Sequence, residues 1–156
     1  MRTGILGLAL GIALTAASAA SAANPLQLEG YVQLEKIVID EAGERRSERV
    51  DPVTVVPGDR LIMGTRYVNE GAAMIESFVV SNPVPAAVRM AQAPDPAQIA
   101  SVDGGRSWGA FGTLMVRAPD GTTRAAGIDD ITHLRWAIPA VAPGGSGTIE
   151  FAVTVR

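Results

Sequence analysis

Short runs in which apolar and polar side chains alternate recur along this chain, and glycine, proline, asparagine or aspartate closes most of them. The clearest runs span 31–40, 60–68, 131–138 and 148–156. A period of two puts every second side chain on one face of an extended strand, whereas an amphipathic helix needs apolar residues three and four positions apart. Strong helical periodicity is missing from the body of the chain, so the sequence predicts an all-β fold.

The alternation also assigns faces to the predicted strands. In 131–138, Leu134, Trp136 and Ile138 share one face, and His133 and Arg135 share the other. We interpret the first face as part of the core, and Trp136 therefore as a core residue. Short antiparallel strands at this spacing are typical of two packed sheets. We expect an antiparallel β-sandwich of about seven to nine strands over residues 24–156.

Other segments of the predicted sandwich are less regular. Residues 74–80 read as a strand that ends at 81–85, because the prolines there lack the N–H that a sheet ladder needs. Residues 86–100 are rich in alanine and proline, and we expect an irregular stretch. The charged segment 45–50 is expected at a solvent-facing sheet edge, where charges discourage strand addition.

The first 23 residues have the order of a secretory signal peptide. Arg2 supplies one positive charge, residues 5–14 are apolar, and residues 15–23 are small, with cleavage fitting after Ala22 or Ala23. A membrane-anchoring helix is the alternative, but the second half of the uncharged stretch is mostly alanine and serine, with no basic stop after it. We therefore predict an exported protein, periplasmic or extracellular, with no membrane span after signal cleavage.

Composition excludes several functional classes. The 156 residues contain no cysteine, which removes disulfide scaffolds, thiol catalysis and cysteine-based zinc or iron–sulfur sites. The formal net charge of −3 argues against nucleic acid as a main partner. An exported domain without disulfides has to rely on its apolar core, and a chain of this length can bury enough surface for that.

Several short motifs occur in an order that resembles a known family. They are Val-Val-Pro-Gly-Asp at 55–59, Asn-Glu-Gly at 69–71, Ser-Asn-Pro-Val-Pro at 81–85, Trp-Ala-Ile at 136–138, and the stretch 142–155. Over 53–156 the chain resembles the bacterial conserved-repeat domain, the domain-of-unknown-function family numbered eleven. The resemblance implies an immunoglobulin-like β-sandwich of secreted and surface proteins. That family has no established catalytic residues, so the resemblance carries none to this chain.

The segment 101–108, Ser-Val-Asp-Gly-Gly-Arg-Ser-Trp, resembles the Asp-box of sialidase propellers. Its chemistry is that of a tight hairpin, in which Asp103 accepts hydrogen bonds from turn amides, Gly105 permits positive φ, and Trp108 packs beneath the turn. One such box in a chain of this length cannot build a propeller of several blades. We therefore interpret Asp103, Gly105 and Trp108 as structural, with glycan handling as the alternative.

His133 is the one histidine of the sequence. A Ser–His–Asp arrangement would need Asp129 or Asp130 beside it, and the sequence has no nucleophile elbow. A copper site would combine His133 with methionines such as Met63, because imidazole and thioether suit copper. Aspartates such as Asp103 could offer oxygens to calcium, but they lack the spacing of a calcium loop. We assign no catalytic, cofactor or metal-binding residue, and His133, Met63 and Asp103 are the metal candidates to check.

These observations favour a non-enzymatic exported β-sandwich that acts as an interaction or structural module of the cell envelope. Its expected partner is an envelope protein or a glycan, and no cofactor is predicted. Two alternatives stay open. One is a periplasmic metal or small-ligand carrier that uses His133 and methionines, and the other is a glycan-binding module that uses Trp108 or Trp136.

Overall fold

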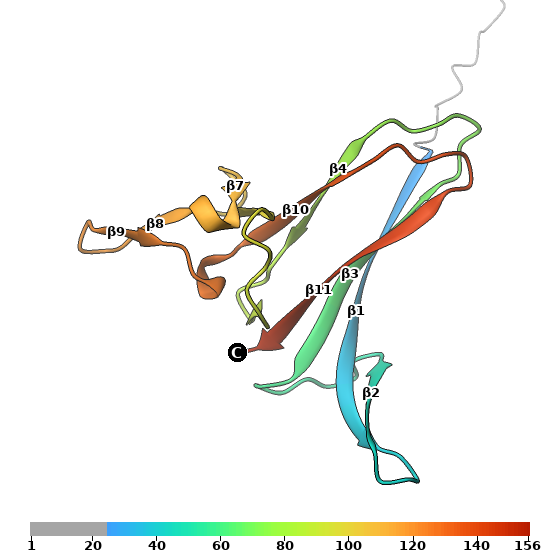
Figure 1. The fold of residues 1–156 in the computed structure, drawn as a ribbon, viewed down its shortest axis with the longest axis horizontal. Helices are drawn as coiled ribbons and strands as arrows, with labels where there is room; N and C mark the ends of the chain where they lie inside the picture. Colours follow the sequence, from blue (N-terminus) through green and yellow to red (C-terminus); the bar gives the residue numbers. More distant parts are fainter. Residues whose placement is uncertain (1–24) are drawn as a thin grey trace, which may run out of the picture.

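The computed structural model describes residues 25–156 (Figure 1), so the predicted signal peptide at 1–23 lies outside the described residues. Within 25–156 the regular elements are β-strands and two one-turn 3-10 helices. The main strands form antiparallel sheets. The prediction of an all-β, sandwich-like fold is confirmed.

The larger sheet, which we call sheet 1, has five strands in the order β2-β1-β3-β11-β5. Three of the four clearest alternating runs form its central strands. The charged segment 45–50 lies at one edge, as its composition predicts. The strands are β1 (Leu26–Ile39), β2 (Arg45–Val50), β3 (Arg60–Asn69), β5 (Val88–Met90) and β11 (Ser146–Val155).

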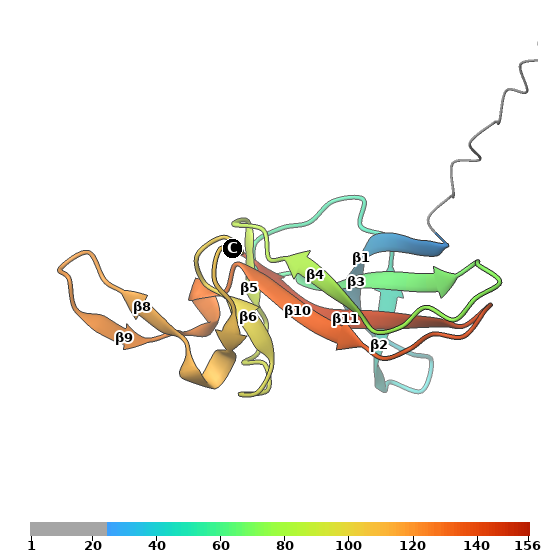
Figure 2. The same ribbon diagram turned by 90° about the horizontal axis from the view of Figure 1, so that it is seen from above.

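The smaller sheet, sheet 2, has the order β4-β10-β6-β7. Its strands are β4 (Phe78–Pro83), β6 (Ile99–Ser101), β7 (Gly109–Ala110) and β10 (His133–Ile138). A separate hairpin of β8 (Met115–Arg117) and β9 (Thr123–Ala125) projects from the body in both views (Figures 1 and 2). The 3-10 helices η1 (Phe111–Thr113) and η2 (Ile128–Asp130) flank this hairpin along the chain.

The described residues therefore contain eleven strands, which is more than the predicted seven to nine. Sheets 1 and 2 account for nine of them, and β8 and β9 pair only with each other. The excess comes from very short strands. A strand of two or three residues is too short to show alternation in the sequence. Such a strand forms because the neighbouring strands of the sheet hold it.

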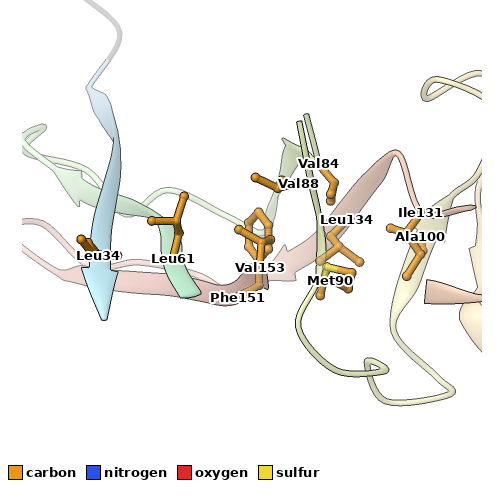
Figure 3. Close-up of a cluster of buried hydrophobic side chains, with 10 residues drawn as sticks. All are labelled: Leu34, Leu61, Val84, Val88, Met90, Ala100, Ile131, Leu134, Phe151 and Val153. Carbon is orange, nitrogen blue, oxygen red and sulfur yellow. The ribbon is translucent and has the colours of Figure 1, made fainter. Parts of the chain in front are cut away.

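The core lies between the inner faces of the two sheets (Figure 3). Leu134 of β10 and Val153 of β11 are 1% and 0% exposed. Half-buried Trp136 packs against both buried clusters and stacks on Phe151 of β11, with ring centroids 5.8 Å apart. The larger cluster consists of Leu34, Leu61, Val84, Val88, Met90, Ala100, Ile131, Leu134, Phe151 and Val153.

The structure corrects two sequence-based boundaries. The strand expected at 74–80 begins only at Phe78 and continues through Pro83. Pro83 is tolerated because β4 is an edge strand, on which a missing N–H can point away from the neighbouring strand. Residues 86–100 are not irregular throughout, since they contain β5 and the start of β6, both held by long-range pairing.

Asn69, read from the sequence only as part of a turn, ties two loops together at one end of sheet 1. Its side chain is 0% exposed. The amide nitrogen donates to the carbonyl oxygens of Ala73, at 2.8 Å, and Val141, at 2.9 Å. The amide oxygen accepts from the Gly71 N–H at 2.9 Å. The loop after β3 and the loop before β11 thus share one buried polar group, as buried amides require.

The outer face of sheet 1 contains a glycine covered by an aromatic ring. Tyr31 lies opposite Gly64, and a Cβ at Gly64 would come within 2.5 Å of the Tyr31 ring. The Tyr31 hydroxyl donates to Glu150 at 2.5 Å, and the Arg66 guanidinium lies 4.0 Å from the ring centroid. This arrangement, in which an aromatic ring covers a strand glycine, stabilises a position that lacks a side chain of its own.

Within residues 25–156, no helix combines the length and the apolar character needed to cross a membrane.

We expect Asn69→Ala to lower the free energy of unfolding by about 2–3 kcal/mol, because it removes three hydrogen bonds that a fully buried side chain makes. Urea denaturation measures the change. Glu70→Ala, at the exposed neighbouring position, is the matched control and should be close to neutral. Equal midpoints for the two variants would contradict the proposed role of Asn69.

We expect Gly64→Ala to cost about 1–2 kcal/mol, because the Tyr31 ring must move away and lose its hydrogen bond to Glu150. Gly30→Ala is the control, since nothing lies within 4 Å of a Cβ at that position. In a double-mutant cycle, Tyr31→Ala should remove most of the Gly64→Ala penalty. Additive effects in urea denaturation would show that the ring and the glycine are not coupled.

Candidate functional site

The segment 101–108 forms the turn between β6 and β7, and its centre is the Asp103 carboxylate. Oδ1 accepts from the Ser101 hydroxyl at 2.8 Å and from the Ser107 N–H at 2.9 Å. It also accepts from the Arg106 N–H at 3.0 Å, and Oδ2 accepts from the Ser107 hydroxyl at 2.6 Å. One carboxylate therefore holds both ends of the turn.

These donors also stabilise the charged form of Asp103. The Ser107 hydroxyl, the Ser107 N–H and the Ser101 hydroxyl together hold the pKa of the carboxyl well below its usual range. Hydrogen bonds to a carboxylate favour ionisation in this way. The turn is thus built around a permanent negative charge whose lone pairs are already used by the protein.

The rest of the turn uses the two features expected from its sequence. Gly104 and Gly105 have φ values of 80° and 84°, which side chains other than glycine rarely adopt. The Trp108 indole N–H donates to the Gly105 carbonyl oxygen at 2.9 Å. Trp108 is half-buried against the turn, so the segment is a self-stabilised hairpin rather than part of a propeller blade.

Trp108 also joins the hairpin to the outer face of β10. Its ring meets His133 edge to face, with centroids 6.0 Å apart. The Arg135 guanidinium lies 3.5 Å from the centroid of the indole. His133 Nδ1 lies 3.2 Å from the Thr132 hydroxyl. Arg135 therefore occupies one face of Trp108, and a sugar ring could not stack on that face without displacing it.

The acids that a Ser–His–Asp arrangement would use are engaged elsewhere. Asp130 makes two hydrogen bonds with the Arg124 guanidinium, at 2.6 and 2.8 Å. Asp129 forms an ion pair with Arg156 at 3.3 Å. Neither carboxylate is hydrogen-bonded to His133 in the described part of the chain. The geometry of the triad, in which an acid orients the imidazole, is not assembled here.

The three metal candidates do not converge. Met63 packs against the core from β3 of sheet 1, while His133 lies on β10 of sheet 2 and contacts Trp108 on the outer face. The Asp103 oxygens already accept hydrogen bonds from the turn. Residues 25–156 contain no group of three or more histidine, aspartate or glutamate side chains placed to hold an ion.

Trp136 lies apart from this cluster, on the inner side of β10. It lines a groove of about 190 Å³ together with Gln92, Asp95 and Gln98. Its indole N–H has no acceptor among the described residues, and the nitrogen is not enclosed by protein. A ligand in this groove would meet a free donor and several amide and carboxylate oxygens.

A second groove, which the sequence reading missed, lies between β1 and β4. We call it the β1–β4 groove. Its volume is about 340 Å³, and no charged side chain lines it. Leu28, on the same face of β1, is 52% exposed, and Val32 is 37% exposed. The groove is lined in part by Gly30, Val32, Met63, Thr65, Asn82 and Phe151.

The groove exists because the two sheets differ in width. Thr65 of β3 donates to the Asn82 side chain of β4 at 2.8 Å, and Tyr67 of β3 meets Phe78 of β4 edge to face. Strand β4 therefore lies over β3, and it is the last strand of sheet 2 on that side. Strands β1 and β2 of sheet 1 extend beyond it. Alternation in 31–40 could have suggested an inner face for β1, but not that this face is left uncovered.

No protein-family model, curated protein or solved structure was found to match this chain.

We expect the Asp103 carboxyl to titrate at lower pH than an ordinary aspartate. Because its pKa is depressed by folding, its contribution to stability is present above the unfolded-state pKa of about 3.9 and is lost as the pH falls through the folded-state value. Asp103→Asn should lower the urea midpoint at pH 7, and the difference from wild type should shrink below about pH 4.

Carbon-detected NMR titration of the Asp103 carboxyl measures the pKa directly. Asp51→Asn is the control, because Asp51 is exposed and the described structure gives it no hydrogen bond or ion pair. It should leave the midpoint unchanged. An Asp103 carboxyl that titrates in the ordinary range would contradict the hydrogen-bonding argument.

Proposed function

We propose that this protein is a non-enzymatic, exported β-sandwich that works as an interaction module of the cell envelope. The observation that carries the proposal is the uncovered inner face of β1. Apolar side chains on the inner face of a sandwich strand are normally covered by the second sheet. Here Leu28 and Val32 stay exposed beside an apolar groove, and apolar surface of that kind is typical of a binding site.

The polar cluster around Asp103 supports the same proposal by its chemistry. Each of its conspicuous groups is used to hold the fold. Asp103 closes the turn, Trp108 bonds to Gly105, and Arg135 stacks on Trp108. Side chains engaged in this way hold the turn in one shape, which supports a role in recognition or support.

Export is supported by sequence alone. The order of charge, apolar run and small residues in 1–23 is typical of a signal peptide. The lack of cysteine is compatible with export, because an apolar core can stabilise the fold without disulfides. The resemblance to the conserved-repeat domain family would place the chain among secreted and surface proteins, with an immunoglobulin-like arrangement of strands. Both remain parts of the proposal.

A glycan is a second candidate partner, favoured by the groove beside Trp136. The free indole N–H and the oxygens of Gln92, Asp95 and Gln98 match the donors and acceptors of a sugar. Gln92→Ala should weaken such binding, while Val79→Ala, on the outer face of β4, should not. Trp136 fluorescence during titration with envelope oligosaccharides separates this candidate from a protein partner.

The test of the main proposal is direct capture. We expect the immobilised protein to retain a defined envelope component, and the purified component to bind it saturably in return. A denatured and cross-linked sample of the same protein is the control. Failure to retain any component above that control would contradict an interaction role. Turnover of an envelope substrate that is lost in His133→Ala would contradict the non-enzymatic role.

A further inference from the structure

The β1–β4 groove has room for one additional strand. Strand β4 covers β3, and β10 covers β11 through the contact of Trp136 with Phe151. A strand added to the free side of β4 would continue sheet 2 and lie over the inner face of β1. Strands of one sheet lie about 4.8 Å apart, so a single strand spans that step.

The free edge of β4 presents hydrogen-bonding groups to such a strand. The Val84 N–H donates to the Thr132 carbonyl, while the Arg135 carbonyl, on the other side of β10, accepts from Gln98. Because backbone groups alternate along a strand, even-numbered residues of β4 face β10. The backbone groups of Val79 and Ser81, and the carbonyl of Pro83, therefore point to the free edge.

The groove itself contains an unsatisfied donor. The Asn82 side-chain oxygen accepts from Thr65, but its amide nitrogen is buried and has no acceptor among the described residues. A buried donor without a partner is costly, and an incoming carbonyl group would relieve that cost. This observation is independent of the exposed apolar face, and Asn82 is one of the residues that line the same groove.

The charges around the groove define the kind of strand. No charged side chain lines the groove, so inward side chains of the occupant must be uncharged. Lys36 follows Leu34 on the inner face of β1, just past the end of the groove. It lies opposite Glu48 in register, but none of the ion pairs found among the described residues includes Lys36. An acidic residue at that end of the occupant would complement Lys36.

We propose that the β1–β4 groove binds an extended segment of a partner protein, which adds to β4 as an antiparallel strand with alternating apolar side chains and an acidic amino-terminal end. The direction follows from the structure. Strand β4 runs from Phe78, at the level of Tyr67, to Asn82, at the level of Thr65, and so toward the Lys36 end. This inference rests on the proposed interaction function and states which kind of segment the partner would supply.

A second copy of the chain fits the groove less well than a single strand. Antiparallel pairing of β4 with β4 of another copy would put both copies of sheet 1 on the same side of the joined sheet. Because β1 and β2 extend beyond β4 in each copy, the two overhangs would occupy the same space. An isolated extended segment brings no second sheet and meets no such conflict.

The test uses a synthetic peptide in which valine and threonine alternate after an amino-terminal aspartate, labelled for fluorescence anisotropy. We expect saturable binding to the protein. Val32→Lys, in the groove, should weaken binding about tenfold or more, because it places a charge against apolar side chains. Met115→Lys is the matched control. Met115 is exposed on β8 of the separate β8–β9 hairpin, away from the groove, so this variant should bind like the wild type.

Two further readouts test strand addition rather than simple apolar adhesion. Hydrogen exchange at the Val79 and Ser81 amides should slow on binding, because these N–H groups face the free edge. A peptide that begins with lysine instead of aspartate should bind more weakly to the wild type, and Lys36→Glu should reverse this preference. Unchanged exchange, or a preference that Lys36→Glu does not reverse, would overturn the proposed placement.

The outcomes also separate this inference from the proposed function. If the captured envelope component binds Val32→Lys as tightly as the wild type, the interaction function stands and the groove is the wrong site. If neither the peptide nor any envelope component binds, both proposals fail. Dimerisation that Val32→Lys abolishes would make the occupant a second copy and overturn the single-strand proposal.

Discussion

The contact between the inner faces of two unequal sheets determines the rest of this structure. Leu134, Trp136, Phe151 and Val153 meet across the layers, and without cysteine no covalent link supplements them. Burial of such side chains is the main favourable term in folding. Because β4 lies over β3, this contact also decides which part of sheet 1 has no cover.

The polar groups divide into those that hold the fold and those that stay available. Asn69 is hydrogen-bonded to two loops, and Asp103 and Trp108 are hydrogen-bonded within their own turn. The Asn82 amide nitrogen is the one buried side-chain donor in residues 25–156 that has no acceptor. Asn82 lines the β1–β4 groove, so the unsatisfied donor and the apolar groove occur together.

Several elements could be predicted because their information is local. The run 131–138 shows its core face by alternation, and segment 101–108 shows its turn by the placement of aspartate and glycine. By contrast, β5 and β6 are three residues long, and their pairing partners are distant in the chain. Pro83 appeared to end a strand, yet β4 continues through it because its missing N–H faces the free edge of the sheet.

The sequence by itself determined that the chain forms strands, which side chains alternate toward a core, and how the Asp103 turn closes, since all of these depend on neighbours within a few residues. Only the tertiary structure decided that Met63 and His133 lie apart, that Arg135 covers a face of Trp108, and that the inner face of β1 is open. Those outcomes depend on how one sheet is placed on the other. That placement results from packing between residues far apart in the chain, which no local pattern encodes.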